Sequence, residues 1–105
     1  MNREDLQFSI RTLSQSLDAA TFASLVRHSH PSDLVEALDI LTTEQAVALL
    51  LTLTPLARAE LFAYFPDKRQ DTLLRAMPRE AVVQLFEQMP SDDRADLYNL
   101  SLIHI

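Results

Sequence analysis

The chain has 105 residues, a formal net charge of −6, and neither cysteine nor glycine. This length predicts one domain, and a hydrophobic content of 48% indicates a folded chain rather than a disordered one. The absence of cysteine excludes a disulfide framework and a thiolate metal site, and the acidic charge argues against a nucleic-acid partner, whose phosphates need lysine and arginine.

Hydropathy gives no sign of direct membrane insertion. The longest apolar run, residues 46–51, is far shorter than the roughly 18–20 residues that a transmembrane helix needs. The N-terminus carries Glu4 and Asp5 and lacks the apolar core of a signal peptide. The low number of basic residues also argues against a polybasic attachment to anionic lipid.

The first predicted element is a helix over residues 1–17. Four apolar residues fall on one side of it at helical spacing: Leu6, Ile10, Leu13 and Leu17. Because this helix lies outside the repeat that follows, we expect it to cover the first repeat unit as an N-terminal capping helix. A second helix is predicted to follow Asp18 as its N-cap and to continue to about His28, burying Phe22, Leu25 and Val26.

From about Val26 to Tyr98, apolar residues recur every twelve positions. One series with this spacing is Leu38, Leu50, Phe62, Leu74, Phe86 and Tyr98. A second series, one position earlier, is Ala37, Leu49, Leu61, Leu73, Leu85 and Leu97. A third series is Leu41, Leu53, Phe65, Met77 and Met89. We interpret all three as core positions, which makes the two methionines packing residues.

A period of twelve does not suit one continuous helix. At about 100° per residue, twelve residues overshoot three turns by roughly 120°, so the chain must break once per unit. Proline stops a preceding helix and is tolerated in the first turn of the next. The breaks are placed at Pro31, Pro55, Pro66, Pro78 and Pro90, with Thr42 and Thr43 at the junction that lacks proline.

These units predict helices near residues 31–40, 43–52, 55–64, 67–76, 79–88 and 91–100. Helices this short rarely hold alone, so they must bury their apolar faces against neighbours. The predicted fold is therefore an all-α solenoid over residues 18–100, with residues 101–105 as an irregular tail. Three N-terminal capping arrangements are expected, formed by Thr42 with Gln45, Thr54 with Pro55, and Asp67 with Gln70.

The densest group of acids is Asp92, Asp93 and Asp96. On a helix, Asp92 and Asp96 share a face, with Cβ atoms roughly 5–6 Å apart. Acids are also favoured in the first turn of a helix by its dipole, and Arg94 stands among them, so a purely structural explanation is available. Oxygen ligands of this kind suit Mg²⁺, which is usually held by one or two carboxylates and several waters. Three acids could supply half of a site, with a partner completing it.

Other candidates have simpler explanations. Glu60 reads as an ordinary solvated acid on a helix with an apolar face. His28 and His30 have a spacing that occurs in metal sites, but no third ligand is nearby and a residue before proline is a helix entry. The aromatic residues Phe62, Tyr64, Phe65 and Phe86 are interpreted as packing. No catalytic motif is present, so we predict that the domain is not an enzyme.

Two motifs give the chain a resemblance to a known family. One is the opening segment His30-Pro31-Ser32-Asp33-Leu34, and the other is the closing segment Pro90-Ser91-Asp92-Asp93-Arg94-Ala95-Asp96-Leu97. With the short helical units between them, residues 20–100 resemble the cytosolic N-terminal domain of MgtE-type magnesium transporters. The resemblance implies a right-handed superhelix of short helices that precedes CBS domains and a Mg²⁺-conducting membrane domain in a homodimeric parent protein.

The same resemblance implies a regulatory role at the cytoplasmic face of the membrane. In this family Mg²⁺ bound between the N domain and the CBS domains holds a closed state, and loss of the ion lets the N domain swing away. By motif position, Asp92 and Asp96 match acids at that interface, Asp93 sits beside them, and Glu60 falls at a further acidic position. With half of each site present, we expect the isolated domain to bind Mg²⁺ weakly, in the millimolar range or worse.

Two other functional classes stay open at this point. A protein–protein adaptor solenoid, of the short-helix type found in flagellar rotor switch proteins, would dock without metal. An enzyme on a helical scaffold is the remaining alternative. The 105 residues contain neither CBS domains nor a transmembrane helix, so this chain by itself is expected to transport nothing.

Overall fold

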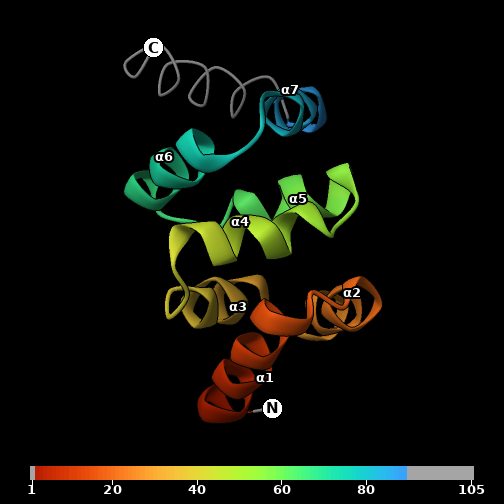
Figure 1. Cartoon of the computed structure of the whole chain (residues 1–105), viewed down its shortest axis with the longest axis vertical. Coiled ribbons are helices and arrows are strands. Elements are labelled where there is room, and N and C mark those ends of the chain that lie inside the picture. The colour runs from red at the N-terminus through yellow and green to blue at the C-terminus, as the bar shows by residue number, and fades with distance from the viewer. Residues whose placement is uncertain (1, 90–105) are drawn as a thin grey trace.

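The computed structural model describes residues 2–89, which form seven α-helices and no strand (Figure 1). The helices are α1 (Arg3–Ser16), α2 (Ala19–His28), α3 (Pro31–Leu38), α4 (Thr43–Leu51), α5 (Pro55–Phe62), α6 (Asp67–Ala76) and α7 (Arg79–Gln88). The predicted all-α class is confirmed. The helix predicted at residues 91–100 and the tail at 101–105 lie outside the described residues.

The twelve-residue period appears directly in the helix starts. Helices α3 to α7 begin at residues 31, 43, 55, 67 and 79, as predicted. Three of them end one or two residues before the predicted ends, because the chain tightens into turns there. After α3, for example, the amide of Ile40 donates to the carbonyl of Ala37 at 3.3 Å, a bond between residues three apart.

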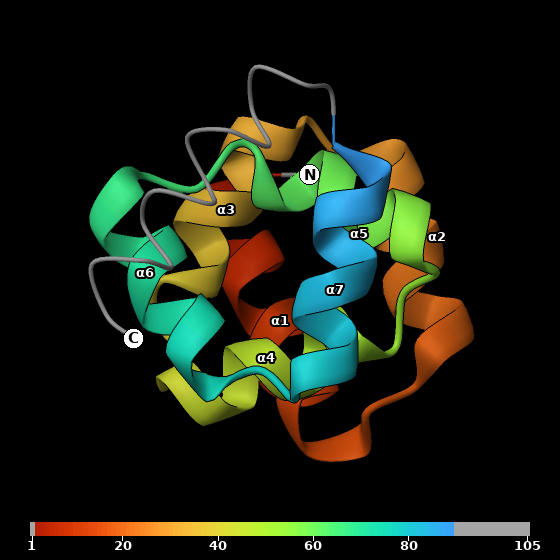
Figure 2. The same cartoon turned by 90° about the horizontal axis from the view of Figure 1, so that it is seen from above.

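Successive repeat helices pack in alternation. Helix α4 contacts α6 and α5 contacts α7, so each of these helices lies against the second one along the chain. Figure 2 shows α6 over α4 on one side and α7 over α5 on the other. Helix α1 packs against both α3 and α4 at the N-terminal end of the stack (Figure 1). None of the helices within residues 2–89 is long and apolar enough to cross a membrane.

The three predicted twelve-residue series supply more than half of the buried apolar residues of the core. Within the described residues, every member of the second and third series is buried, including Met77 and Met89. The first series is buried through Leu74, and Phe86 is partly buried against the core. Phe22 of α2 is also buried, with Leu25 and Val26 packed beside it. Burial of an apolar side chain contributes about 1.5–3 kcal/mol, so these series are the main source of stability.

The helix ends confirm two of the three predicted caps. Thr42 and Gln45 form a reciprocal capping box, and the Thr54 hydroxyl accepts from the amide of Ala57 at 3.3 Å. The third prediction is wrong, because α6 begins at Asp67 itself and Pro66 occupies the N-cap position without a side-chain bond. Gln70 instead donates from Nε2 to the carbonyl of Phe62 at 3.2 Å.

Leu17, predicted to lie on the apolar side of the first helix, falls just outside that helix. It follows α1 as the C-cap in the left-handed region, with φ 53°, and its side chain is 42% exposed. Its amide donates to the carbonyl of Leu13 and closes the helix. A position of this kind usually holds glycine, and the chain has none.

Candidate functional site

The predicted acids fall into two groups. Asp92, Asp93 and Asp96 lie outside the described residues. Glu60 lies on α5 and is exposed, and within residues 2–89 its carboxylate forms neither an ion pair nor a hydrogen bond. In the same part of the chain, no group of three or more histidine, aspartate or glutamate side chains could hold a metal ion. Glu60 thus belongs to no cluster of three or more such side chains among the described residues.

Glu60 stands at the edge of a small cleft between α2, the start of α3, and α5. The cleft has a volume of about 320 Å³ and is lined by Val26, Pro31, Ala57, Glu60, Leu61 and Tyr64. Glu60 is the sole ionisable carboxylate among these residues, and Tyr64 supplies the aromatic surface. We call this feature the Glu60 cleft. Apart from the carboxylate and the tyrosine hydroxyl, its side chains are apolar.

The sequence-based interpretation of Tyr64 as a packing residue is wrong. Its side chain is 51% exposed, whereas Phe62 and Phe65 on either side are buried. The Tyr64 ring meets the His30 ring edge-on, with ring centroids 6.3 Å apart and an interplanar angle of 80°. This contact joins the end of α5 to the start of α3 and orients the tyrosine beside the cleft.

The two histidines at the α2–α3 junction are engaged at their helix ends. The Nδ1 atom of His28 lies 2.7 Å from the carbonyl oxygen of Ser24, one turn earlier in α2. The Nδ1 atom of His30 accepts the amide of Ser32 at 3.1 Å and so caps the N-terminus of α3. Both Nδ1 atoms therefore bond to the backbone, and the contact made by His30 confirms its interpretation as a helix entry.

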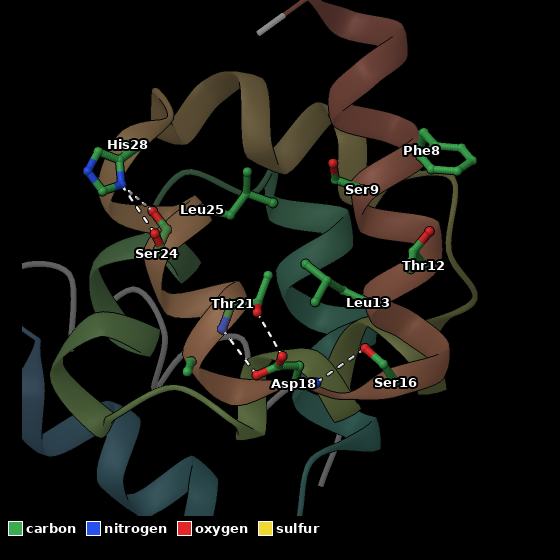
Figure 3. A pocket seen from close by; sticks show the side chains of 11 residues that line it. Phe8, Ser9, Thr12, Leu13, Ser16, Asp18, Thr21, Ser24, Leu25 and His28 are labelled. Atoms are coloured by element: carbon green, nitrogen blue, oxygen red, sulfur yellow. Dashed lines mark hydrogen bonds between the residues drawn. The ribbon is translucent and has the colours of Figure 1, made fainter.

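A larger groove runs between α1 and α2, with a volume of about 730 Å³ (Figure 3). Hydroxyl side chains from both helices line it, together with Phe8, Leu13 and Leu25. Asp18 and His28 are the ionisable residues of this groove, and both are bonded within their own helix. The Thr21 hydroxyl, which donates to the carboxylate, is the main cause that lowers the pKa of Asp18, and the Thr21 amide adds to it. Both ionisable side chains of the groove thus form hydrogen bonds at the ends of α2.

Arg58 is a buried cation that sequence reasoning missed. Its side chain is 5% exposed, yet every polar atom finds a partner. Nε donates to the carbonyl of Leu50 at 2.9 Å, and Nη2 donates to the carbonyl of Leu53 at 3.0 Å. Nη1 reaches Gln84 of α7 at 3.2 Å. Burial lowers the pKa of Arg58, but the carbonyls at the C-terminal end of α4 stabilise its charge.

A signal for Arg58 was present in the repeat. Its position corresponds to Leu34 and Ala46 in the two preceding units, and both of these are buried. A charged residue at an inward-facing position predicts a buried polar contact, since an unpaired charge in the core is costly. Arg69 of α6 also forms hydrogen bonds to an earlier unit. It donates to the carbonyl of Leu41 at 3.3 Å and to the hydroxyl of Thr43 at 3.4 Å.

Comparison with known proteins gives one finding. A family model described as the MgtE intracellular N domain matches residues 29–100. The match begins just before α3 and covers the twelve-residue repeats together with the segment that contains Asp92, Asp93 and Asp96. No curated protein and no solved structure matches the chain.

Proposed function

The chain belongs to the family of MgtE intracellular N domains and is thus a regulatory domain of magnesium-transporter type, and from this premise we propose that it senses Mg²⁺ by docking on CBS domains through shared ions. The observation that carries the proposal is the extent of the match. Residues 29–100 include both the opening motif at His30 and the closing acidic motif that contains Asp92 and Asp96. The family is regulatory rather than catalytic, in keeping with the lack of catalytic motifs.

The proposed ion contacts are Asp92 and Asp96, with Asp93 beside them. Mg²⁺ prefers oxygen ligands and keeps several waters, so two or three carboxylates on one surface can hold half of its shell while a partner supplies the rest. Glu60 is the fourth acid of the proposal and lies on the described part of the domain. Without the ion, acidic surfaces repel each other, and the docked state loses its main attraction.

The stacked helices support this mechanism because they allow the domain to move as one rigid body when it docks or leaves its partner. Helix α4 contacts α6, and α5 contacts α7. The side chains of Arg58 and Arg69 form hydrogen bonds between helices. We expect these contacts to resist bending of one repeat unit against the next. An ion that binds only the docked state shifts the population toward docking by its differential affinity. We infer that the parent transporter is a homodimer in which each domain docks at the cytoplasmic face of the membrane.

The first experiment is a calorimetric titration of the chain with MgCl₂. A shared site with half of its ligands predicts millimolar affinity or weaker, and further weakening in the double variant Asp92→Asn with Asp96→Asn. Asp39→Asn, an exposed acid after α3, is the matched control and should bind as the unaltered chain does. Micromolar affinity that depends on Asp92 would contradict sharing, because it would mean a complete site within this chain.

The second experiment measures docking itself. A CBS-domain pair from an MgtE-type transporter is mixed with the chain in MgCl₂ and in EDTA, and association is followed by sedimentation velocity. Association that requires Mg²⁺ and both aspartates supports the proposed function. Equal association in EDTA would instead identify a metal-independent adaptor domain.

A further inference from the structure

Helix α5 and the turn that follows it carry an exposed row of three residues at four-residue spacing, Leu56, Glu60 and Tyr64. We propose that this row, which we call the α5 row, makes direct apolar contact with the CBS domains. Glu60 keeps its place at a shared ion, and the side chains of Leu56 and Tyr64 pack against the partner on either side of it. The inference rests on the proposed function and deepens it, because it adds a protein contact to the shared ions.

The two apolar members of the α5 row are both exposed to solvent. The side chain of Leu56 is 53% exposed and that of Tyr64 is 51% exposed, and Glu60 between them is exposed as well. Residues four apart are neighbours on the surface of a helix. Single exposed apolar residues are common, whereas neighbouring ones indicate a surface that meets a partner.

The repeat shows that this arrangement is particular to α5. The position of Leu56 is exposed in each of helices α3 to α7, and the other four helices have a polar residue there, namely Ser32, Glu44, Lys68 and Glu80. At the position of Tyr64, α3 also has an exposed apolar residue, Ile40, but its other flank is the serine. Among helices α3 to α7, α5 alone therefore has large apolar side chains on both sides of its central position.

The tyrosine of the α5 row is held in place before any partner binds. Although α5 ends at Phe62, the chain continues in a turn, with the Tyr64 amide donating to the carbonyl of Leu61 at 3.1 Å. The His30 ring meets the Tyr64 ring edge-on, with centroids 6.3 Å apart. A side chain that is already ordered loses less entropy on docking, so its contact contributes more to affinity.

The Glu60 cleft extends the apolar surface beside the row. It shares Glu60 and Tyr64 with the row, and its remaining lining residues are the apolar Val26, Pro31, Ala57 and Leu61. Glu60 is the one charged residue of this lining, and the proposed function assigns it to the ion. The partner surface that fits is therefore apolar around an ion-binding centre.

Docking on a CBS-domain pair, measured by sedimentation velocity over a series of MgCl₂ concentrations, tests the α5 row. Leu56→Ser and Tyr64→Thr introduce the residues that α3 and the end of α4 have at the same positions, Ser32 and Thr52. Each variant should weaken docking roughly three- to tenfold at every Mg²⁺ concentration, because about half of each side chain is available for burial. Tyr64→Phe keeps the ring and should dock as the unaltered chain does.

The dependence of affinity on Mg²⁺ separates the apolar contact from the ion contact. By linkage, the slope of log affinity against log Mg²⁺ concentration gives the number of ions taken up on docking. Leu56→Ser should leave this slope unchanged, whereas Glu60→Gln should lower it. The control is Phe8→Ser, which removes a 71% exposed apolar side chain from α1 at the other end of the stack (Figure 1) and should have no effect.

Two outcomes would overturn this inference alone. One is unchanged affinity of both Leu56→Ser and Tyr64→Thr in a domain that still docks with Mg²⁺. The other is a lower slope for Leu56→Ser, because the leucine would then act through the ion site. A domain that docks at no Mg²⁺ concentration would refute the proposed function together with this inference, so the two failures are distinguishable.

Discussion

Arg58 donates from Nε to the carbonyl oxygen of Leu50, eight residues earlier, at 2.9 Å. Twelve residues later the same relationship recurs, since Gln70 donates from Nε2 to the carbonyl of Phe62 at 3.2 Å. In both cases a side chain in the first half of one helix satisfies a carbonyl near the C-terminal end of the preceding helix. Each of these carbonyls also accepts the amide three residues later, that of Leu53 or Phe65, so the side chain adds a second donor at the end of the helix.

Arg58→Met tests how much the side-chain hydrogen bonds of Arg58 contribute to stability. The substitution keeps an unbranched apolar stem but removes the side-chain donors to the carbonyls of Leu50 and Leu53, of which Leu50 keeps the amide of Leu53. A buried group that loses its partner costs about 1–3 kcal/mol, so we expect the free energy of unfolding to fall by about 1–3 kcal/mol in urea denaturation.

The control for that measurement is Lys68→Met, which makes the same replacement at an exposed basic residue of α6. Its effect should stay within about 0.5 kcal/mol. If Arg58→Met were as mild as the control, the hydrogen bonds of Arg58 would contribute nothing net, and the stack would be held by apolar packing alone.

The repeat explains why so much of the fold could be predicted from the sequence. Five helix starts follow one another at a fixed interval of twelve residues, and helices α3 to α7 begin where that interval places them. The apolar series predict which residues are buried, because a position that faces the core in one unit also faces it in the next. Local chemistry was sufficient for the caps at Thr42 and Thr54, whose partners lie three residues away.

Contacts between distant residues could not be predicted in the same way. The exposure of Tyr64 depends on the helices that fail to cover it, and its partner His30 is 34 positions earlier in the chain. Gln70 was predicted to form a cap from its spacing to Asp67. Its side chain instead donates to Phe62 of the preceding helix, a contact that local sequence does not show. The acidic motif at Asp92 was found in the sequence and its role was inferred from a resemblance, and both stay predictions because the motif lies outside the described residues.

Leu17→Gly should stabilise the domain. Leu17 is the one non-glycine residue within positions 2–89 that has a positive φ, and the left-handed conformation costs roughly 1–2 kcal/mol for a residue with a Cβ. Glycine removes this strain and loses more entropy on folding, so we expect a net gain of about 0.5–1 kcal/mol in thermal or chemical unfolding.

Ser16→Gly is the matched control for Leu17→Gly. Ser16 is the last residue of α1, where φ is helical, so glycine there gains nothing from a left-handed conformation. The free energy of unfolding should fall by a few tenths to about 1 kcal/mol. Destabilisation of similar size by both substitutions would contradict the strain at Leu17.

The capping box of α4 predicts coupling between its two members. The Thr42 hydroxyl accepts from the amide of Gln45 at 3.2 Å, and the Gln45 side chain accepts from the amide of Thr42 at 3.0 Å. Thr42→Ala should cost about 1 kcal/mol. In a double-mutant cycle with Gln45→Ala, we expect a coupling energy of about 0.5 kcal/mol or more, as for residues in direct contact. Strict additivity would mean that the two bonds form independently.

Asp18 predicts how stability changes at acidic pH. The Thr21 hydroxyl donates to one carboxylate oxygen at 2.7 Å and the Thr21 amide donates to the other at 3.2 Å (Figure 3), and these bonds lower the pKa of Asp18. A lowered pKa in the folded state means that the unfolded chain binds the proton more readily. The contribution of Asp18 is therefore fully present above the ordinary aspartate value of about 3.9 and is lost as the pH falls through the lower folded value.

Thermal unfolding of the unaltered chain and of Thr21→Val, followed from pH 7 downward, measures this effect. Valine keeps the branched shape of threonine but removes the hydroxyl donor, which is the largest cause of the lowered pKa. The difference in stability between the two proteins should be constant at neutral pH and should narrow below about pH 4, because protonation weakens the bond that the variant already lacks. A difference that stays constant to the lowest pH would show that the charge of the Asp18 carboxylate does not strengthen this cap.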